Sequence, residues 1–310
     1  MSELNVTNIN ATNIDTTALE VDSLTSPGGL QLPQITLGAF TDATRPTSGV
    51  TAGTIIWNTD SAEVQVWNGE AWVNISKKSA ASLPEDGLYL HLDATNTDSY
   101  PGNGSTWTDL SPYGHNFQVP TDRFVGSGGS MGSYFAFTTG TQAKNGGDIS
   151  LSGDVSYVAV TRPLNSTAQW RTLTRSYSAD HHVIIQSGAW NIGMYDNNGS
   201  GFIGTGYSQQ SLPGYGSNSF MVMIWRWSNA DNPTYELHVN GISRGTITNS
   251  NARYNRGFGS IGGYHGGNTN PSTGSQPWGD IRMFAAYNRR LTVQEITDIQ
   301  VALESQGYLN

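Results

Sequence analysis

Aromatic and amide side chains are concentrated in three glycine-rich segments of the C-terminal half of the chain. These segments cover residues 206–218, 253–260 and 262–280 and are rich in Tyr, Trp, Asn, Gln and Gly. Aromatic faces cover the apolar surfaces of sugar rings, and planar amides bind sugar hydroxyls. The pattern therefore predicts glycan binding by Tyr207, Tyr215, Tyr254, Tyr264, His265, Asn268 and Trp278.

The same aromatic residues also have a purely structural interpretation. Tyr264 and Trp278 would then pin glycine-rich loops onto a sheet or meet a neighbouring subunit. Trp107 is expected in the core, and Trp225 and Trp227 alternate within a predicted strand, so they share one face. The sequence leaves both interpretations of the loops open.

Patterns typical of covalent or phosphate chemistry are absent from the sequence. His181 and His182 are adjacent, and adjacent strand residues point to opposite faces, so we expect structural or surface roles for them rather than a shared metal. The chain contains no phosphate-binding G-x-x-x-x-G-K loop and no serine nucleophile-elbow motif. We therefore predict no catalytic residues.

The composition favours β-structure and argues against binding to anionic polymers. Only 13% of the 310 residues are charged and 37 are glycine, which is typical of strands and loops rather than helices. The net charge is −9 with few lysines, so nucleic acids and anionic membranes are poor partners. The chain has no cysteine, which excludes disulfides and thiolate metal sites.

The first thirty residues lack the charged and apolar regions of a secretory signal, and no segment is apolar enough to span a membrane. If the protein works outside a cell, it does not leave by an ordinary signal peptide, and synthesis in the cytoplasm followed by release by lysis as part of a virus particle would reconcile the two.

The elements expected to position these side chains are short strands. Apolar runs recur between Gly and Asn turns from residue 88 to about 290, which predicts an antiparallel β-sandwich or jelly roll. One C-terminal helix is predicted after residue 292, with Thr292 as its cap and Glu295 at the capping-box position.

The first 87 residues divide into three predicted segments. Residues 1–45 are polar, with sparse apolar residues such as Val6, Ile9 and Ile14, and we expect them to order only against other copies or a larger surface. A disordered tail is the alternative. Residues 46–76 predict a three-stranded aromatic meander, residues 77–87 a linker and residues 88–310 the sandwich.

The meander is too small to bury its large rings by itself. Trp57, Trp67 and Trp72 are therefore predicted, with Val6, Ile9 and Ile14, to lie in an interface between copies, most economically around a threefold axis. Packing against the chain's own sandwich is the rival interpretation.

Two resemblances to known families follow from quoted motifs. The stretch "RPTSGVTAGTIIWNTDSAEVQVWNGEAWVNI" resembles a module of tailed-bacteriophage fibre and appendage proteins. Residues 87–310 resemble the concanavalin A-like, laminin G-like superfamily through "LHLDA", "SYPGNGSTWTDLSPYGHN", "YELHVNG" and "YNRRLTVQEI". That resemblance implies two antiparallel sheets packed face to face.

The superfamily includes glycoside hydrolases, but their usual paired carboxylates on one strand are missing here. Glu236 is the only glutamate of the sandwich outside its terminal segment. Many relatives hold a calcium ion, for which Asp93, Asp109 and Asp280 are candidates, although turn capping is the preferred explanation for Asp93 and Asp109. No other cofactor is expected.

The sequence thus predicts a phage tail or head fibre that adsorbs to host-surface glycan. The expected partners are other copies in a homotrimer, further virion proteins through the N-terminal segment, and host polysaccharide. A capsid decoration without host binding and a glycoside hydrolase remain the alternatives.

Overall fold

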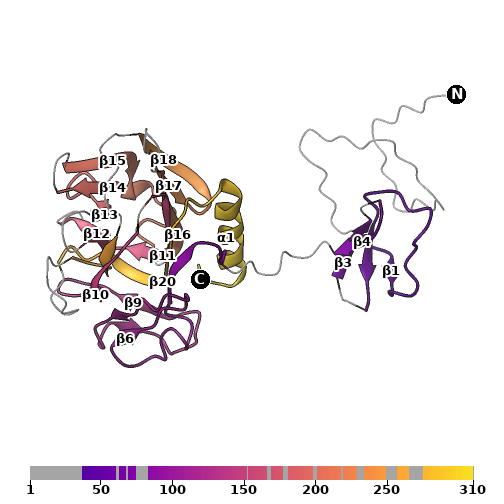
Figure 1. The fold of residues 1–310 in the computed structure, drawn as a ribbon, viewed down its shortest axis with the longest axis horizontal. Coiled ribbons are helices and arrows are strands. Elements are labelled where there is room, and N and C mark those ends of the chain that lie inside the picture. The colour runs from indigo at the N-terminus through magenta and orange to yellow at the C-terminus, as the bar shows by residue number, and fades with distance from the viewer. Residues whose placement is uncertain are drawn as a thin grey trace. The chain divides into compact units, whose positions relative to one another are not determined.

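The computed structural model divides the chain into two compact units, Met1–Ser76 and Lys77–Asn310 (Figure 1). It describes residues 37–60, 63–67, 69–74, 83–151, 153–165, 169–176, 181–197, 201–217, 219–228, 234–248, 257–264 and 275–309. The predictions for Val6, Ile9, Ile14, Tyr254, His265 and Asn268 lie outside the described residues.

The N-terminal unit contains a four-stranded sheet. Its strands are β1 (Ala39–Phe40), β2 (Ile55–Asn58), β3 (Glu63–Trp67) and β4 (Trp72–Asn74), in that spatial order. β1 runs parallel to β2, and the other pairs are antiparallel. The structure thus adds one strand, β1, before the predicted meander. The sequence does not indicate this strand, because two residues are too few to show a periodicity.

One face of this small sheet is closed by the chain itself. Trp67 and Trp72 face each other across β3 and β4 with ring centroids 5.5 Å apart, and Trp72 Nε1 donates a hydrogen bond of 2.6 Å to the Pro46 carbonyl. Asn58, which is fully buried, donates to Asp42 and to Gln65. The segment before β2 therefore covers this face.

The second unit is the predicted β-sandwich, which the structure confirms. One sheet, named here the site sheet, has the order β15-β14-β13-β12-β19-β10-β7-β6. Its strands are β6 (Thr106–Trp107), β7 (Phe117–Gln118), β10 (Ala143–Ile149), β12 (Arg171–Arg175), β13 (His181–Ile185), β14 (Asn191–Asp196), β15 (Gly201–Ser208) and β19 (Phe258–Ile261).

The other sheet, named here the helix sheet, has the order β18-β17-β16-β11-β20-β9-β8, with β5 also paired to β20. Its strands are β5 (Leu88–Asp93), β8 (Phe124–Val125), β9 (Tyr134–Ala136), β11 (Val155–Pro163), β16 (Met221–Trp227), β17 (Thr234–Val239), β18 (Ile242–Thr248) and β20 (Gly279–Tyr287). A short 3-10 helix, η1 (Gln209–Ser211), follows β15.

An aromatic core fills the space between the two sheets. Trp107 is fully buried there, as predicted, and Trp225 and Trp227, which are predicted only to share one face, are fully buried there too. Trp278 is also fully buried, and its Nε1 donates a 2.7 Å hydrogen bond to Thr161 Oγ1. The prediction that Trp278 binds glycan is therefore wrong, because its ring has no face open to a ligand.

A second core lies between the helix sheet and the C-terminal helix α1 (Val293–Ser305), seen beside the sheet in Figure 1. In β11 and β16, alternate side chains enter the two cores, so that Trp225 faces the site sheet and Ile224 faces the helix. Burial on both faces explains why the segment "FMVMIW" is continuously apolar rather than alternating. No helix among the described residues is long and apolar enough to cross a membrane.

The start of α1 confirms the predicted capping box. Thr292 Oγ1 accepts from the Glu295 amide at 3.1 Å, and Glu295 Oε2 accepts from the Thr292 amide at 2.8 Å. A salt bridge from Arg289, at 2.6 Å, lowers the pKa of Glu295 to about 2, with further help from Thr292. These bonds satisfy amide donors that a helix start leaves unpaired.

Replacement of Thr292 by Ala should lower the free energy of unfolding by about 1 kcal/mol, because the first helical turn loses its cap. Urea denaturation of the sandwich measures this change. Thr297→Ala, at an exposed position inside the same helix, is the matched control and should be neutral or slightly stabilising. Equal losses in both variants would contradict the capping role.

Candidate functional site

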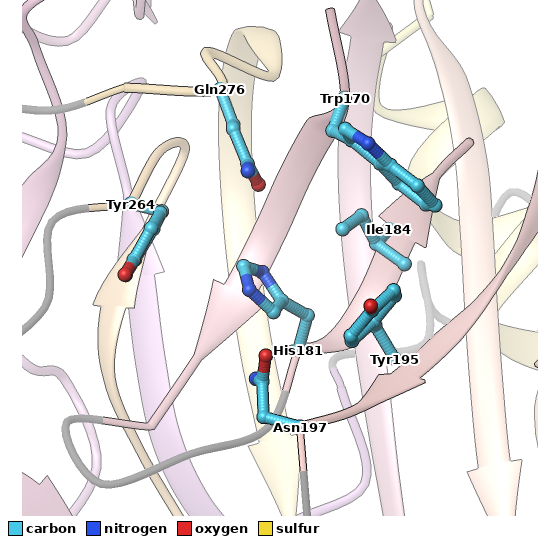
Figure 2. Close-up of a pocket in the computed structure, with 7 residues that line it drawn as sticks. All are labelled: Trp170, His181, Ile184, Tyr195, Asn197, Tyr264 and Gln276. Carbon is cyan, nitrogen blue, oxygen red and sulfur yellow. The ribbon is translucent and has the colours of Figure 1, made fainter. Parts of the chain in front are cut away.

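A pocket of about 220 Å³ opens on the face of the site sheet that points away from the core (Figure 2). Figure 2 shows aromatic rings and polar side chains converging on it from β13, β14 and two flanking loops. Its lining residues are Trp170, His181, Ile184, Tyr195, Asn197, Tyr264 and Gln276. Aromatic surface combined with a few convergent polar groups is typical of a ligand site.

Strand alternation places the floor of the pocket. Val183 and Met194 belong to the core between the sheets, whereas their neighbours Ile184 and Tyr195 line the pocket. Because successive strand residues point to opposite faces, a strand anchored by its core residues must present the others outward. The pocket floor is thus as fixed as the core beneath it.

Two glycines bring Tyr264 to the pocket. Gly262 has a positive φ of 79°, and a side chain there would collide with the Phe137 ring. A Cβ on Gly263 would lie 2.5 Å from the Thr141 carbonyl oxygen. Only glycine tolerates this turn and this close approach, so the two glycines set the direction in which the chain leaves β19.

The loop that begins at Tyr264 is closed by a short bridge. Tyr264 and Ser275 exchange backbone hydrogen bonds of 2.7 and 2.5 Å. Consequently Tyr264 and the next residue after the bridge, Gln276, lie at one side of the same pocket (Figure 2). Residues 265–274, between the bridge partners, lie outside the described part of the chain.

Gln276 is held in an uncommon backbone conformation. Its φ of 50° lies in the left-handed region, which costs a non-glycine residue about 1 kcal/mol. Two hydrogen bonds with Thr172 hold it, since Gln276 O accepts from the Thr172 amide at 3.0 Å and Oε1 accepts from the Thr172 hydroxyl at 2.7 Å. Such outliers concentrate at functional sites.

The same hydroxyl fixes the tautomer of His181. Thr172 Oγ1 also lies 2.9 Å from His181 Nδ1. Because the hydroxyl proton is used on Gln276, Nδ1–H must be the donor in this second bond, which leaves Nε2 as an acceptor. Within the described residues, His181 makes no other hydrogen bond, so Nε2 is available to a ligand hydroxyl.

His181 is neutral at physiological pH. Burial lowers its pKa to about 3, and the nearby charges of Arg175 and His182 act in the same direction. The residue therefore contributes hydrogen bonds to the pocket but no charge between pH 5 and 9.

The aromatic rings that line the pocket also contact other side chains of the protein. Trp170 meets Tyr195 edge to face, with centroids 5.4 Å apart, and packs on Phe202 at 5.6 Å. The Arg175 guanidinium lies 3.7 Å from the centre of the Tyr264 ring, so one face of that ring is covered by protein. These contacts restrict ring movement and preorganise the walls.

Only part of the predicted glycan site coincides with this pocket. Tyr264 lines it, whereas Tyr207 donates to the Ser211 carbonyl and Tyr215 packs against Trp190. The strand residues Tyr195 and His181 were missed, because strand pairing brings them to the loops and no local motif marks that pairing. The remaining residues missed by the loop-based prediction are Trp170, Ile184, Asn197 and Gln276, of which Gln276 lies within a loop that the sequence singled out.

The three candidate calcium ligands make hydrogen bonds within the protein. Asp109 accepts four, from the amides of His91, Ser111 and His115 and from the Ser111 hydroxyl. Asp93 accepts from Thr95 and from the Tyr308 hydroxyl.

Asp280 pairs with Arg162 at 2.5 Å. Among the described residues no group of three or more His, Asp or Glu side chains could hold a metal ion. Calcium binding by Asp93, Asp109 and Asp280 stays a prediction.

Glu236, the candidate carboxylate for hydrolysis, is enclosed by positive charge. Burial by itself would raise its pKa, but Arg226, at 2.5 Å, and Arg290 outweigh that effect and lower it. A general acid in glycoside hydrolysis needs a raised pKa, and a nucleophile needs an open approach. Its contacts therefore suit an ion-pair network that ties β16 and β17 to the segment before α1.

Sequence comparison identifies the N-terminal region. Residues 8–84, about a quarter of the chain, match the family described as "Phage tail like trimerisation region". This part of the chain is thus similar to a phage tail-like trimerisation region, and the match supports a virion component that forms a homotrimer. No curated protein sequence matches the chain.

Several solved structures resemble parts of this chain at low identity. Domain 4 of the extracellular arabinanase AbnA from Geobacillus stearothermophilus, determined with arabinotriose, is 14% identical, with a TM-score of 0.49, over 70% of this chain and all of that one. The binding domain of Paraclostridial Mosquitocidal Protein 1 is 17% identical, with a TM-score of 0.47, over 70% of this chain and 52% of that one. A Trypanosoma rangeli sialidase mutant is 14% identical, with a TM-score of 0.44, over 74% of this chain and 35% of that one.

The low pKa of His181 predicts a pH dependence of stability. The unfolded chain takes up a proton near the ordinary value of 6.5, but the folded chain does so only near pH 3. The contribution of this group to stability is therefore complete above pH 6.5 and falls as the pH decreases toward 3.

Urea unfolding of the wild type and His181→Gln between pH 4 and 8 measures this effect. The wild type should lose up to about 1.4 kcal/mol more per pH unit below pH 6 than the variant. Parallel pH profiles for the two proteins would contradict the assignment.

Proposed function

We propose that this protein is a trimeric appendage of a phage particle whose β-sandwich binds neutral glycans of the host surface. The trimerisation region supports the appendage, and the pocket on the site sheet supports the binding activity. The observation that carries the proposal is the chemistry of the pocket lining, which combines three aromatic rings with two amides and a neutral imidazole.

The lining favours a small, uncharged and hydroxyl-rich ligand. Among the described residues that line the pocket, none is Asp, Glu, Lys or Arg. Its volume of about 220 Å³ is below the ~300 Å³ at which pockets for drug-sized molecules begin, so one sugar residue of a longer chain is the fitting occupant. Amide groups and imidazole Nε2 can then bind hydroxyls while the rings cover the apolar sugar face.

Trimerisation raises the overall affinity for a polysaccharide above that of one small pocket. A single pocket with few polar groups binds weakly, but three pockets on one appendage act together at a high effective concentration on a repetitive polysaccharide. In this proposal the N-terminal segment attaches the trimer to other virion proteins, and the sandwich is displayed on the particle surface after release by lysis.

The contacts of the carboxylates support binding without hydrolysis. Glu236 forms ion pairs with two arginines. Asp93 and Asp109 accept hydrogen bonds from donors in the turns around them. A hydrolytic pair requires one protonated and one free carboxyl group facing the same open cleft. Capsid decoration without host binding is the remaining alternative, and the experiment below distinguishes it.

Trp170→Ala should weaken binding of purified host polysaccharide to the full chain by about two- to tenfold per site, since one aromatic wall is lost. Affinity electrophoresis with neutral and acidic polysaccharides measures this effect. Tyr113→Ala, which removes a ring that is 53% exposed and outside the pocket, is the matched control and should bind like the wild type.

Four outcomes would count against the proposal. Equal binding by Trp170→Ala and the wild type would move the site elsewhere, and binding of acidic polysaccharides alone would contradict a neutral ligand. Release of new reducing ends during incubation would identify a hydrolase. Absence of binding to any host polysaccharide would favour the decoration protein.

A further inference from the structure

We infer that three copies of the chain pack together through one face of the small sheet, formed by Ile55, Trp57, Val64 and Val66 and named here the Trp57 face. The inference rests on the trimeric appendage proposed above and deepens it by assigning the residues that join the copies. It also divides the three tryptophans of this unit into one for the interface and two for the interior.

Strand register places the four side chains on the same face. Ile55 lies opposite Val66, and Trp57 lies opposite Val64, in the antiparallel pair β2 and β3. Directly opposed residues of antiparallel strands share a face. The Trp57 face is therefore a continuous apolar surface on two adjacent strands.

The described residues of a single copy leave this face open. Ile55 is 45% exposed and Trp57 is 37% exposed, while Val64 and Val66 are half-buried. An isolated small sheet with an exposed apolar face is marginally stable in water. A partner surface is needed for the burial that would stabilise it.

The opposite face cannot serve as the interface. Trp67 is 9% exposed and packs on Trp72, whose indole nitrogen is bonded to Pro46 within the same chain. Residues 56, 58 and 65 on that face are at most 5% exposed. Exposed apolar area in this sheet is thus concentrated on the other side, at β2.

A second and third copy of the chain are the partners that the observations favour. The matching trimerisation region spans residues 8–84 and so contains the whole small sheet, but it ends before β5, the first strand of the sandwich, at Leu88. An exposed apolar surface inside a trimerisation region is expected to contact the same region of the other copies of the chain. Aromatic and aliphatic side chains without charges are also typical of the centre of a permanent homo-oligomeric interface.

Light scattering on the full chain tests the assignment. The wild type should have the mass of a trimer, and Trp57→Glu should have that of a monomer, because a carboxylate would be buried without a partner in each copy. Thr51→Glu adds the same charge at an exposed position of the preceding turn and should remain trimeric. A trimeric Trp57→Glu variant would overturn the inference.

Thiol reactivity provides a second test that does not depend on how the charged variant folds. The chain has no cysteine, so Ile55→Cys and Thr51→Cys each introduce a single thiol. In the trimer, Ile55→Cys should react with a maleimide at least tenfold more slowly than Thr51→Cys.

Equal rates in the two cysteine variants would overturn the inference. Slow reaction of Ile55→Cys that persists in a monomeric sample would overturn it too, because a segment of the same chain would then cover the face. A wild-type monomer would remove both this inference and the trimeric part of the proposed function. Polysaccharide binding, measured on the same sample, would still report separately on the pocket.

Discussion

Burial of the central strands on both faces is the constraint on which the rest of the sandwich depends. β11, β16 and β20 lie between the site sheet and α1, and their alternate side chains enter two separate cores. With apolar groups on both faces, these strands cannot be exposed on either side without a large loss of stability. They therefore fix the position of the site sheet on one side and of the capped helix on the other. The pocket lies on the outer face of the sheet that this arrangement holds in place.

The architecture could be predicted from local sequence, whereas the site could be predicted only in part. Recurrent short apolar runs indicated a sandwich, and Thr292 with Glu295 marked the helix start, because these features depend on neighbouring residues. The pocket depends on pairing across the chain, which brings Tyr195 of β14 into the same pocket as Tyr264, 69 residues later in the chain. Trp278 shows the opposite failure, since a tryptophan in a glycine-rich loop looks like a ligand contact until its burial is known.

The alternation of side chains between the two faces of a strand explains why three tryptophans so close in sequence have different surroundings. Trp67 and Trp72 occupy opposed positions of β3 and β4, and Trp57 lies on the other face of the same sheet. The interpretation that all three are interface residues treats the rings as equivalent, but a sheet has two faces, and the described residues cover only one of them. The small unit thus combines an internal aromatic pair with an apolar surface, while the sandwich completes its cores within one chain.

Hydroxyl-radical footprinting of the full chain with and without host polysaccharide tests the central claim most directly, because it reports where a glycan touches the protein. The account predicts that oxidation of Trp170, Tyr195 and Tyr264 decreases at saturating polysaccharide, while oxidation of the exposed Tyr113 is unchanged. Protection confined to Tyr113, Tyr207 or Tyr215, with the three pocket rings oxidised as in the free protein, would contradict it.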